Sequence, residues 1–154
     1  MSDLLKVSQE KLEDVNEIKK RLSSDLNIFR NIYFDYLVIT FYADFEKELN
    51  KLITDKLSEN IFSKKYADFI SLKYKQLHGG LNHENFKALV STVFGKNIDT
   101  STKEWQIYCA FIKFRNSISH NDNYEIAKNT LLSNISDIDE VLKILICYLE
   151  ILRT

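Results

Sequence analysis

Residues 32–53 read IYFDYLVITFYADFEKELNKLI, and this stretch decides the fold class. Its apolar side chains recur at steps of three, four or seven residues, the period of an α-helix with one face turned to a core. The period continues to about residue 57, which predicts the longest helix of the chain. No run alternates strictly as a strand does, and no proline and only three glycines interrupt helices. The sequence therefore predicts an all-α protein.

The sequence on either side of this stretch predicts further helices. Residues 4–26 carry the same apolar period, and we expect this helix to lie antiparallel to the long one through a short connection at 27–31. A shorter helix is expected over 63–77, before the clearest break in the chain at residues 78–82, HGGLN. Asn82 and Asn85 then begin a helix that runs to Phe94 and that Gly95 ends.

Two more helices complete the expected fold. Ser101 or Thr102 serves as N-cap of a helix that carries Glu104 in its first turn and runs to about Ile118. Residues 119–123 favour caps and turns. The final helix, 136–152, is apolar almost all round and is expected to be the most enclosed element. We therefore expect one domain, 1–154, built as a bundle of five to six helices with a buried C-terminal helix.

Cysteine usage and the N-terminus predict the compartment. Cys109 and Cys147 lie far apart inside apolar segments, without neighbours at metal-ligand spacing, so they are expected to be small core residues in a reducing cytoplasm. The chain opens without the basic-then-apolar order of a signal peptide, and no uncharged apolar run reaches membrane-spanning length. We expect a soluble cytoplasmic protein with no membrane partner.

The charge of the chain is unevenly distributed. The net charge of −1 at first argues against a nucleic-acid partner, because such partners need a basic face. Residues 1–60 carry nine Lys and Arg against twelve Asp and Glu, residues 61–131 ten against six, and residues 132–154 two against four. The basic excess thus surrounds Arg115 and His120. Lysines such as Lys64 and Lys65 also solvate helix surfaces in proteins that bind no anion.

Arg115 and His120 are the candidate catalytic pair. Arg115 continues a helical stripe with Tyr108, Phe111 and Ile112, so it points toward the interior or a cleft. Five steps of roughly 100° place His120 about 140° further round a continuous helix. The two side chains cannot share a face of a straight helix. Either the last helical turn unwinds or another chain completes the site.

These residue types suit RNA cleavage without a metal. An imidazole titrating near neutral pH can take a proton from a 2′-hydroxyl or give one to a leaving 5′-oxygen, and a guanidinium can hold the phosphate through two hydrogen bonds. Asn116 can orient the ring or the phosphate. The structural alternative is that Arg115 pairs with a carboxylate and His120 caps a helix C-terminus, and the residue types alone favour it.

The sequence context resembles a known family. The segment 114–122, FRNSISHND, is similar to the signature of the HEPN family, in which Arg, usually followed by a polar residue such as Asn, precedes His after four to six intervening positions. Residues 37–49, LVITFYADFEKEL, resemble the long second helix of that family, where an acidic residue often follows an aromatic one. The resemblance covers most of the chain, but only the first segment is a specific motif.

The resemblance implies a function. It implies a helical bundle that forms a homodimer with both motifs facing one cleft, and a metal-independent endoribonuclease of toxin–antitoxin or phage-defence systems, with RNA as substrate and an antitoxin protein as a further partner. By the match Arg115 and His120 are catalytic, Asn116 is a supporting residue, and Glu46 helps to position the motif. Some relatives carry, two residues after the His, a Tyr that an antitoxin modifies; Asp122 stands there, which puts that control in doubt.

The remaining candidates concern RNA contacts, metals and a different class of function. Candidate RNA contacts are Lys113, Asn121, Lys64 and Lys65. His78 and His83 flank two glycines, but no further ligand stands at tight spacing, so we expect no metal site and no cofactor. The alternative class is a non-catalytic helical module, a degenerate HEPN domain that binds a nucleotide or a protein partner.

Overall fold

A computed structural model describes residues 2–21, 26–60, 70, 81–120 and 122–154. The described helices are α1 (Lys6–Arg21), α2 (Leu26–Asn60), α4 (His83–Phe94), α5 (Lys103–His120), α6 (Tyr124–Asn134) and α7 (Asp139–Arg153). No strand occurs among these residues, which confirms the all-α prediction for the described part of the chain. The helix predicted at 63–77, with Lys64 and Lys65, lies outside the described residues except for Ile70, which is helical.

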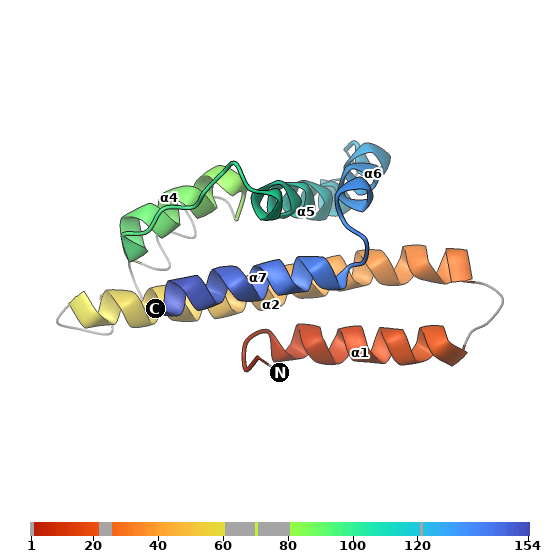
Figure 1. The fold of residues 1–154 in the computed structure, drawn as a ribbon, viewed down its shortest axis with the longest axis horizontal. Coiled ribbons are helices and arrows are strands. Elements are labelled where there is room, and N and C mark those ends of the chain that lie inside the picture. Colours follow the sequence, from red (N-terminus) through yellow and green to blue (C-terminus); the bar gives the residue numbers. More distant parts are fainter. Residues whose placement is uncertain (1, 22–25, 61–69, 71–80, 121) are drawn as a thin grey trace.

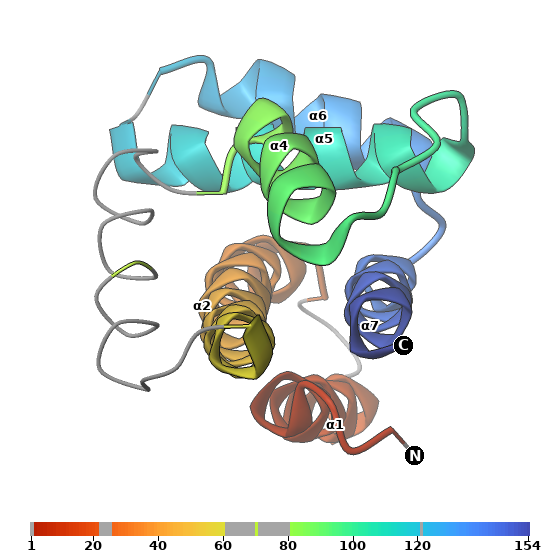
Figure 2. The ribbon, with the colours of Figure 1, turned by 90° about the vertical axis from the view of Figure 1, so that its left-hand side faces the viewer.

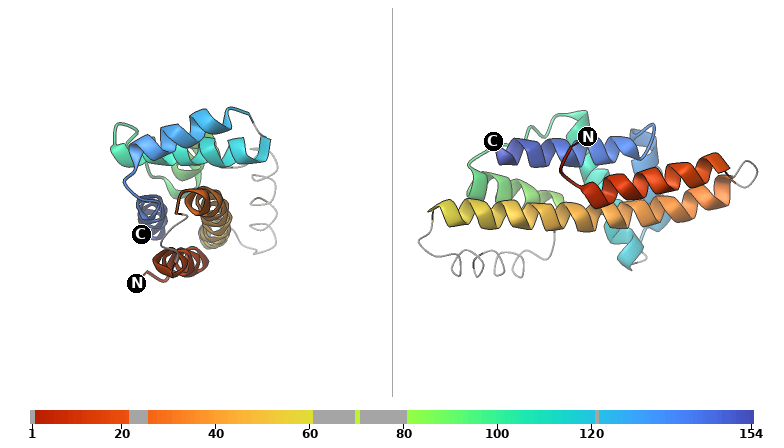
Figure 3. Two further views of the ribbon diagram at one scale, coloured as in Figure 1. Left: turned by 90° about the vertical axis from the view of Figure 1, so that its right-hand side faces the viewer. Right: turned by 90° about the horizontal axis from the view of Figure 1, so that it is seen from below.

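The helices form two layers. The lower layer in Figure 1 is a bundle of three helices along the longest axis of the molecule, in which α1 lies below α2 and α7 and is antiparallel to both. The antiparallel pair α5 and α6 crosses above α2 and α7, and α4 lies beside α5 (Figure 2). Figure 3 shows the two layers from the opposite end (left) and the molecule from below (right). None of the described helices is long and apolar enough to cross a membrane.

Aromatic side chains fill the space between the layers. Phe45 of α2, Phe86 of α4 and Tyr108 of α5 are each no more than 1% exposed. The Phe86 ring centroid lies 4.9 Å from that of Tyr108 and 5.7 Å from that of Phe45. Full burial of such a side chain contributes roughly 1.5–3 kcal/mol. This cluster fixes α5, the helix that carries the motif, against α2.

Local sequence rules set several helix ends. The side chain of Asn82 caps α4 by accepting a hydrogen bond from the Asn85 backbone N–H at 2.8 Å. Gly95 follows α4 with φ of 62°, a left-handed conformation that glycine adopts without steric cost. The Thr102 hydroxyl accepts a hydrogen bond from the Trp105 backbone N–H at 3.2 Å and caps α5. These predicted helix ends are confirmed.

Other predicted helix ends need correction. The first helix begins at Lys6 rather than at residue 4, because Leu5 adopts φ of 52° and is buried in the core together with Leu4. Residues 27–31, the predicted connection, lie inside α2. α6 was not predicted at all, and the last helix begins at Asp139 rather than at residue 136.

The C-terminal helix is less enclosed than predicted. Leu145 and Leu149 are fully buried, but Ile151 is 47% exposed on the opposite face of α7. Cys147 is also exposed and Cys109 is half-buried, and both thiols are free. The interpretation of both cysteines as core residues is therefore wrong for Cys147, because α7 turns one face to solvent.

Candidate functional site

The motif lies on a continuous helix. α5 is helical from Lys103 to His120, two residues beyond the predicted end at Ile118. The last turn therefore does not unwind, and that explanation of the motif is wrong. With about 100° and 1.5 Å per residue, the Arg115 and His120 side chains leave the helix about 140° apart and about 7.5 Å apart along its axis. One chain thus presents them on different sides of α5.

Arg115 faces α2. Its guanidinium carbon lies 3.9 Å from the centroid of the Tyr42 ring, a stacking geometry favourable for a cation over an aromatic face. One guanidinium N–H donates to Asn116 Oδ1 at 3.1 Å. Within the described part of the chain Arg115 makes no ion pair, so the predicted carboxylate partner of the structural alternative is not found there. The half-buried guanidinium keeps further N–H donors for other acceptors.

Asp44 and Glu46 are the acidic residues of α2 that follow Tyr42 most closely in the sequence. Asp44 is 8% exposed, and its Oδ2 accepts hydrogen bonds at 2.9 Å from both the backbone N–H and the hydroxyl of Ser8. It therefore anchors the first turn of α1 to α2. Glu46 is half-buried on α2, one turn beyond Tyr42 on the same face. Among the described residues no hydrogen bond or ion pair joins Glu46 to Arg115, and the predicted positioning role of Glu46 stays a prediction.

His120 lies at a cleft between α5 and α6. The cleft has a volume of about 620 Å³. Its α5 side is formed by residues at steps of three, four and seven, which is one helical face: Lys113, Asn116, Ser117 and His120. The cleft is also lined by Ala110 of α5, by Asp122 and Asn123 between the two helices, and by Ile126, Ala127 and Thr130 of α6. The cleft thus places an imidazole, an ammonium group and an amide on one wall.

Asn116 connects the two halves of the motif. Its side-chain oxygen accepts the hydrogen bond from Arg115, and the residue also lines the cleft that contains His120. When the oxygen faces Arg115, the amide nitrogen of the same side chain is left to donate elsewhere. Asn116 therefore links Arg115 to the cleft that contains His120.

The cleft is open to solvent and chemically mixed. His120, Lys113 and Asp122 are exposed, whereas Ser117 is 5% exposed and donates its hydroxyl to the Phe114 carbonyl at 2.7 Å. Ile126, at 68% exposure, is the most exposed large apolar residue of the described chain. The cleft thus combines an exposed imidazole and an ammonium group with a carboxylate and one exposed apolar side chain.

Sequence reasoning found part of this cleft. Arg115, Asn116, His120 and Lys113 lie on one helix, and three of them share the cleft wall. Asn121, Lys64 and Lys65 lie outside the described residues. The α6 residues that close the cleft were missed together with the helix itself. The spacing of seven between Lys113 and His120 is the signal that places them on one face.

The described residues form no cluster of metal ligands. In that part of the chain, no three or more His, Cys, Asp or Glu side chains are placed to hold a metal ion. His83 begins α4 and lies 3.6 Å from the Glu84 carboxylate, while His78 lies outside the described residues.

Comparisons with other proteins give no relative. No family model matches the chain, and no curated protein or solved structure shows significant similarity to it.

Proposed function

We propose that the protein is a metal-independent endoribonuclease of the HEPN type that acts as a homodimer. The observation that carries the proposal is the polar face of α5, where His120 shares a cleft with Lys113 and Asn116 while Arg115 leaves the same helix on another side. The resemblance of residues 114–122 to the HEPN signature adds the reaction class. A toxin or phage-defence role, with an antitoxin as partner, follows from that resemblance.

The proposed reaction is transesterification within RNA. His120 takes the proton of a 2′-hydroxyl, the 2′-oxygen bonds to phosphorus, and the bond from phosphorus to the 5′-oxygen breaks. The His120 imidazolium formed in this way gives the proton to that leaving oxygen, so the imidazole is neutral again and the products are a 2′,3′-cyclic phosphate and a 5′-hydroxyl. Arg115 binds two non-bridging oxygens and stabilises the charge of the transition state. Such an acid–base group contributes about 10²- to 10⁴-fold.

A second copy of the chain is part of the proposal. In one chain about 140° of helix rotation separates Arg115 from His120, so a single copy cannot bring both to one phosphate. The guanidinium has an amide and a ring as its neighbours and no carboxylate among the described residues. It is thus able to pair with a phosphate held at the cleft of the second copy. A two-fold axis would form two equivalent composite sites.

One observation favours a second candidate function. The stacking of Arg115 on Tyr42 is a stabilising contact that needs no substrate. A non-catalytic module would keep this contact and use the cleft beside His120 for a nucleotide or a protein partner. Under this candidate the module binds through the cleft and cleaves nothing.

His120→Ala separates the two candidates, with His83→Ala as the matched control. Each change removes one imidazole, and His83 lies on α4 outside the cleft. We expect His120→Ala to lower the single-turnover cleavage rate of a mixed RNA pool at least 100-fold, while His83→Ala stays within twofold of the unaltered protein. Equal cleavage by a folded His120→Ala variant would exclude the enzymatic proposal.

A further inference from the structure

α6 is held in place by a partly buried cluster of three polar side chains, Asp35, Tyr124 and Lys128. Lys128 of α6 is 6% exposed, and its ammonium donates to Asp35 Oδ1 of α2 and to the Tyr124 hydroxyl, both at 3.0 Å. The Tyr124 hydroxyl in turn donates to the other carboxylate oxygen of Asp35. Each member of the cluster contacts both others. These hydrogen bonds join Asp35 to Tyr124, 89 residues away in the sequence, and to Lys128, 93 residues away.

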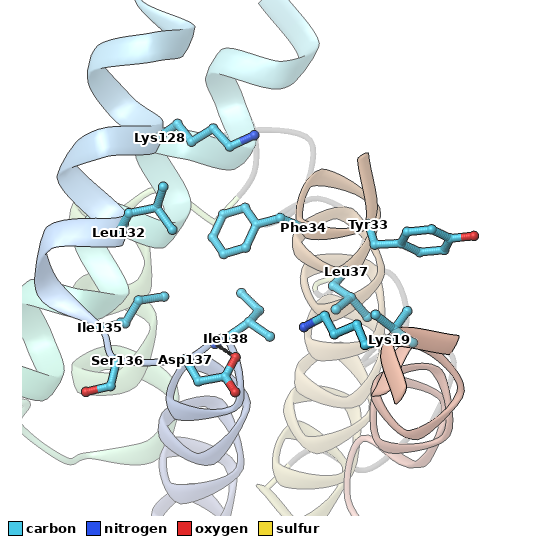
Figure 4. Close-up of a pocket in the computed structure, with 11 residues that line it drawn as sticks. Lys19, Tyr33, Phe34, Leu37, Lys128, Leu132, Ile135, Ser136, Asp137 and Ile138 are labelled. Atoms are coloured by element: carbon cyan, nitrogen blue, oxygen red, sulfur yellow. Dashed lines mark hydrogen bonds between the residues drawn. The ribbon is translucent and has the colours of Figure 1, made fainter. Parts of the chain in front are cut away.

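Aromatic rings enclose the same ammonium group. The Lys128 nitrogen lies 5.6 Å from the ring centroid of Phe34, 5.8 Å from that of Phe114 and 5.3 Å from that of Tyr124. Figure 4 shows the Lys128 chain extended toward Phe34 at one end of a cavity of about 650 Å³. Phe114 is the residue before Arg115 on α5. The cluster therefore joins α2, α5 and α6 at the helix that carries the motif.

The two faces of α6 have different partners. Asn123, Ile126, Ala127 and Thr130 line the cleft beside His120. Tyr124, Lys128 and the fully buried Leu131 lie at steps of four and three on the inner face. Any rotation or lifting of α6 that breaks the inner contacts must also move the cleft wall.

The start of α6 depends on this cluster. Asn123, the residue before the helix, has φ of 57° and its side chain makes no capping hydrogen bond. A left-handed residue without a cap is a weak helix start. The next residue is Tyr124, whose hydroxyl contacts Asp35 and whose ring lies 5.5 Å from that of Phe114. These contacts hold the first turn at the end of the cleft.

We infer that Asp35, Tyr124 and Lys128 are positioning residues that hold α6 in register and so set the cleft geometry beside His120. None of the three lies on the cleft wall, so they act through α6 rather than on the substrate. The catalytic consequence rests on the proposed function, whereas the effect on α6 does not.

Tyr124→Phe and Asp35→Asn test the inference, because each keeps the shape of the side chain and removes one hydrogen-bonding or charged group. Tyr36→Phe is the matched control, since Tyr36 is 44% exposed on α2 next to Asp35. Peptide-resolved hydrogen exchange compares the exchange rate of α6, residues 124–134, with that of α7, residues 139–153, which serves as the internal reference. We expect exchange in α6 to rise about tenfold or more in both test variants, because a lost hydrogen bond to a charged group changes an equilibrium by about one to two powers of ten. α7 should stay within twofold, and Tyr36→Phe should change neither helix.

A second measurement separates positioning from stability. The single-turnover cleavage rate of both variants should fall about tenfold, while the Kd for an uncleavable 2′-deoxy analogue of the RNA stays within threefold, because the cleft residues are still present. The inference would be overturned if the hydrogen-exchange rate of α6 did not change, or if it rose equally in α6 and α7. It would also be overturned if α6 exchanged faster while the RNA cleavage rate stayed the same. If His120→Ala cleaves as well as the unaltered protein, the proposed function fails alone, and hydrogen exchange still decides whether the cluster holds α6.

Discussion

Tyr42 contacts Arg115 through the face of its ring, and through its hydroxyl it contacts the chain leading into α4. The guanidinium carbon of Arg115 lies 3.9 Å from the ring centroid, and the Tyr42 hydroxyl accepts a hydrogen bond from the Leu81 backbone N–H at 3.2 Å. Tyr42 is 4% exposed, so its position is fixed by the core. Arg115 therefore stacks on a ring that the core holds in place.

Arg115→Met tests whether the stacking contributes stability. The change keeps an unbranched side chain and removes the cation, so we expect the free energy of unfolding to fall by about 1 kcal/mol. Lys113→Met is the control, because Lys113 is exposed on the same helix and its loss should cost less than about 0.5 kcal/mol. Urea unfolding followed by circular dichroism measures both. Equal stabilities of the two variants would show that the ring contact contributes nothing.

Asp44→Ala should loosen the first helix. The variant loses two hydrogen bonds to the fully buried Ser8 and leaves its hydroxyl and backbone N–H without an acceptor, which costs about 2 kcal/mol. The exposed Asp55 lies on the same helix, and Asp55→Ala should be nearly neutral. Differential scanning calorimetry compares their Tm values. An Asp44→Ala protein as stable as Asp55→Ala would contradict an anchoring role for Asp44.

The cluster around Lys128 predicts a loss of stability in alkali. Burial lowers the pKa of Lys128, but its hydrogen bonds with Tyr124 and Asp35 raise that pKa above the ordinary value. Burial and the hydrogen bond to Asp35 also raise the pKa of Tyr124. Both groups hold their protons more tightly in the folded protein. Their contribution to the free energy of unfolding is thus complete below the pKa values of the unfolded chain, about 10 for Tyr and 10.4 for Lys. It is lost as the pH rises through the pKa values of the folded protein.

Urea unfolding at pH 8 and pH 11 measures this loss. The unaltered protein should lose more stability between the two pH values than a Tyr124→Phe, Lys128→Met double variant, which lacks both titrating groups. A Lys87→Met variant controls for removing an ammonium group, since Lys87 is exposed on α4. An equal loss in the double variant would mean that other groups cause the alkaline transition.

Periodicity and local rules predict much of this fold. α2 and α5 follow from apolar steps of three and four, and Asn82, Gly95 and Thr102 mark helix ends through contacts within three to four residues. α6 was missed because it is short, its start at Asn123 and Tyr124 follows a run typical of turns, and its exposed Ile126 breaks the usual amphipathic pattern. A short helix of this kind is stabilised by tertiary contacts rather than by its own sequence.

The candidate site was predicted less completely than the fold. Arg115 and His120 are recognisable from residue type and spacing, and the angle between them follows from helix geometry. The contact of Arg115 with Tyr42 and the cluster of Asp35 with Tyr124 and Lys128 join distant parts of the sequence. No local pattern marks such pairs, so they require the folded chain.

Mixing two inactive variants tests the composite site most directly. An Arg115→Ala chain keeps His120 and a His120→Ala chain keeps Arg115, so a mixed dimer would contain one intact pair contributed by both copies. We predict that each variant alone is at least 100-fold slower than the unaltered protein in RNA cleavage with EDTA present. After co-refolding in equal amounts, activity should return to about a quarter of the unaltered level, because half of the dimers are mixed and each has one of two sites. No recovery in a sample shown to contain mixed dimers would contradict the account.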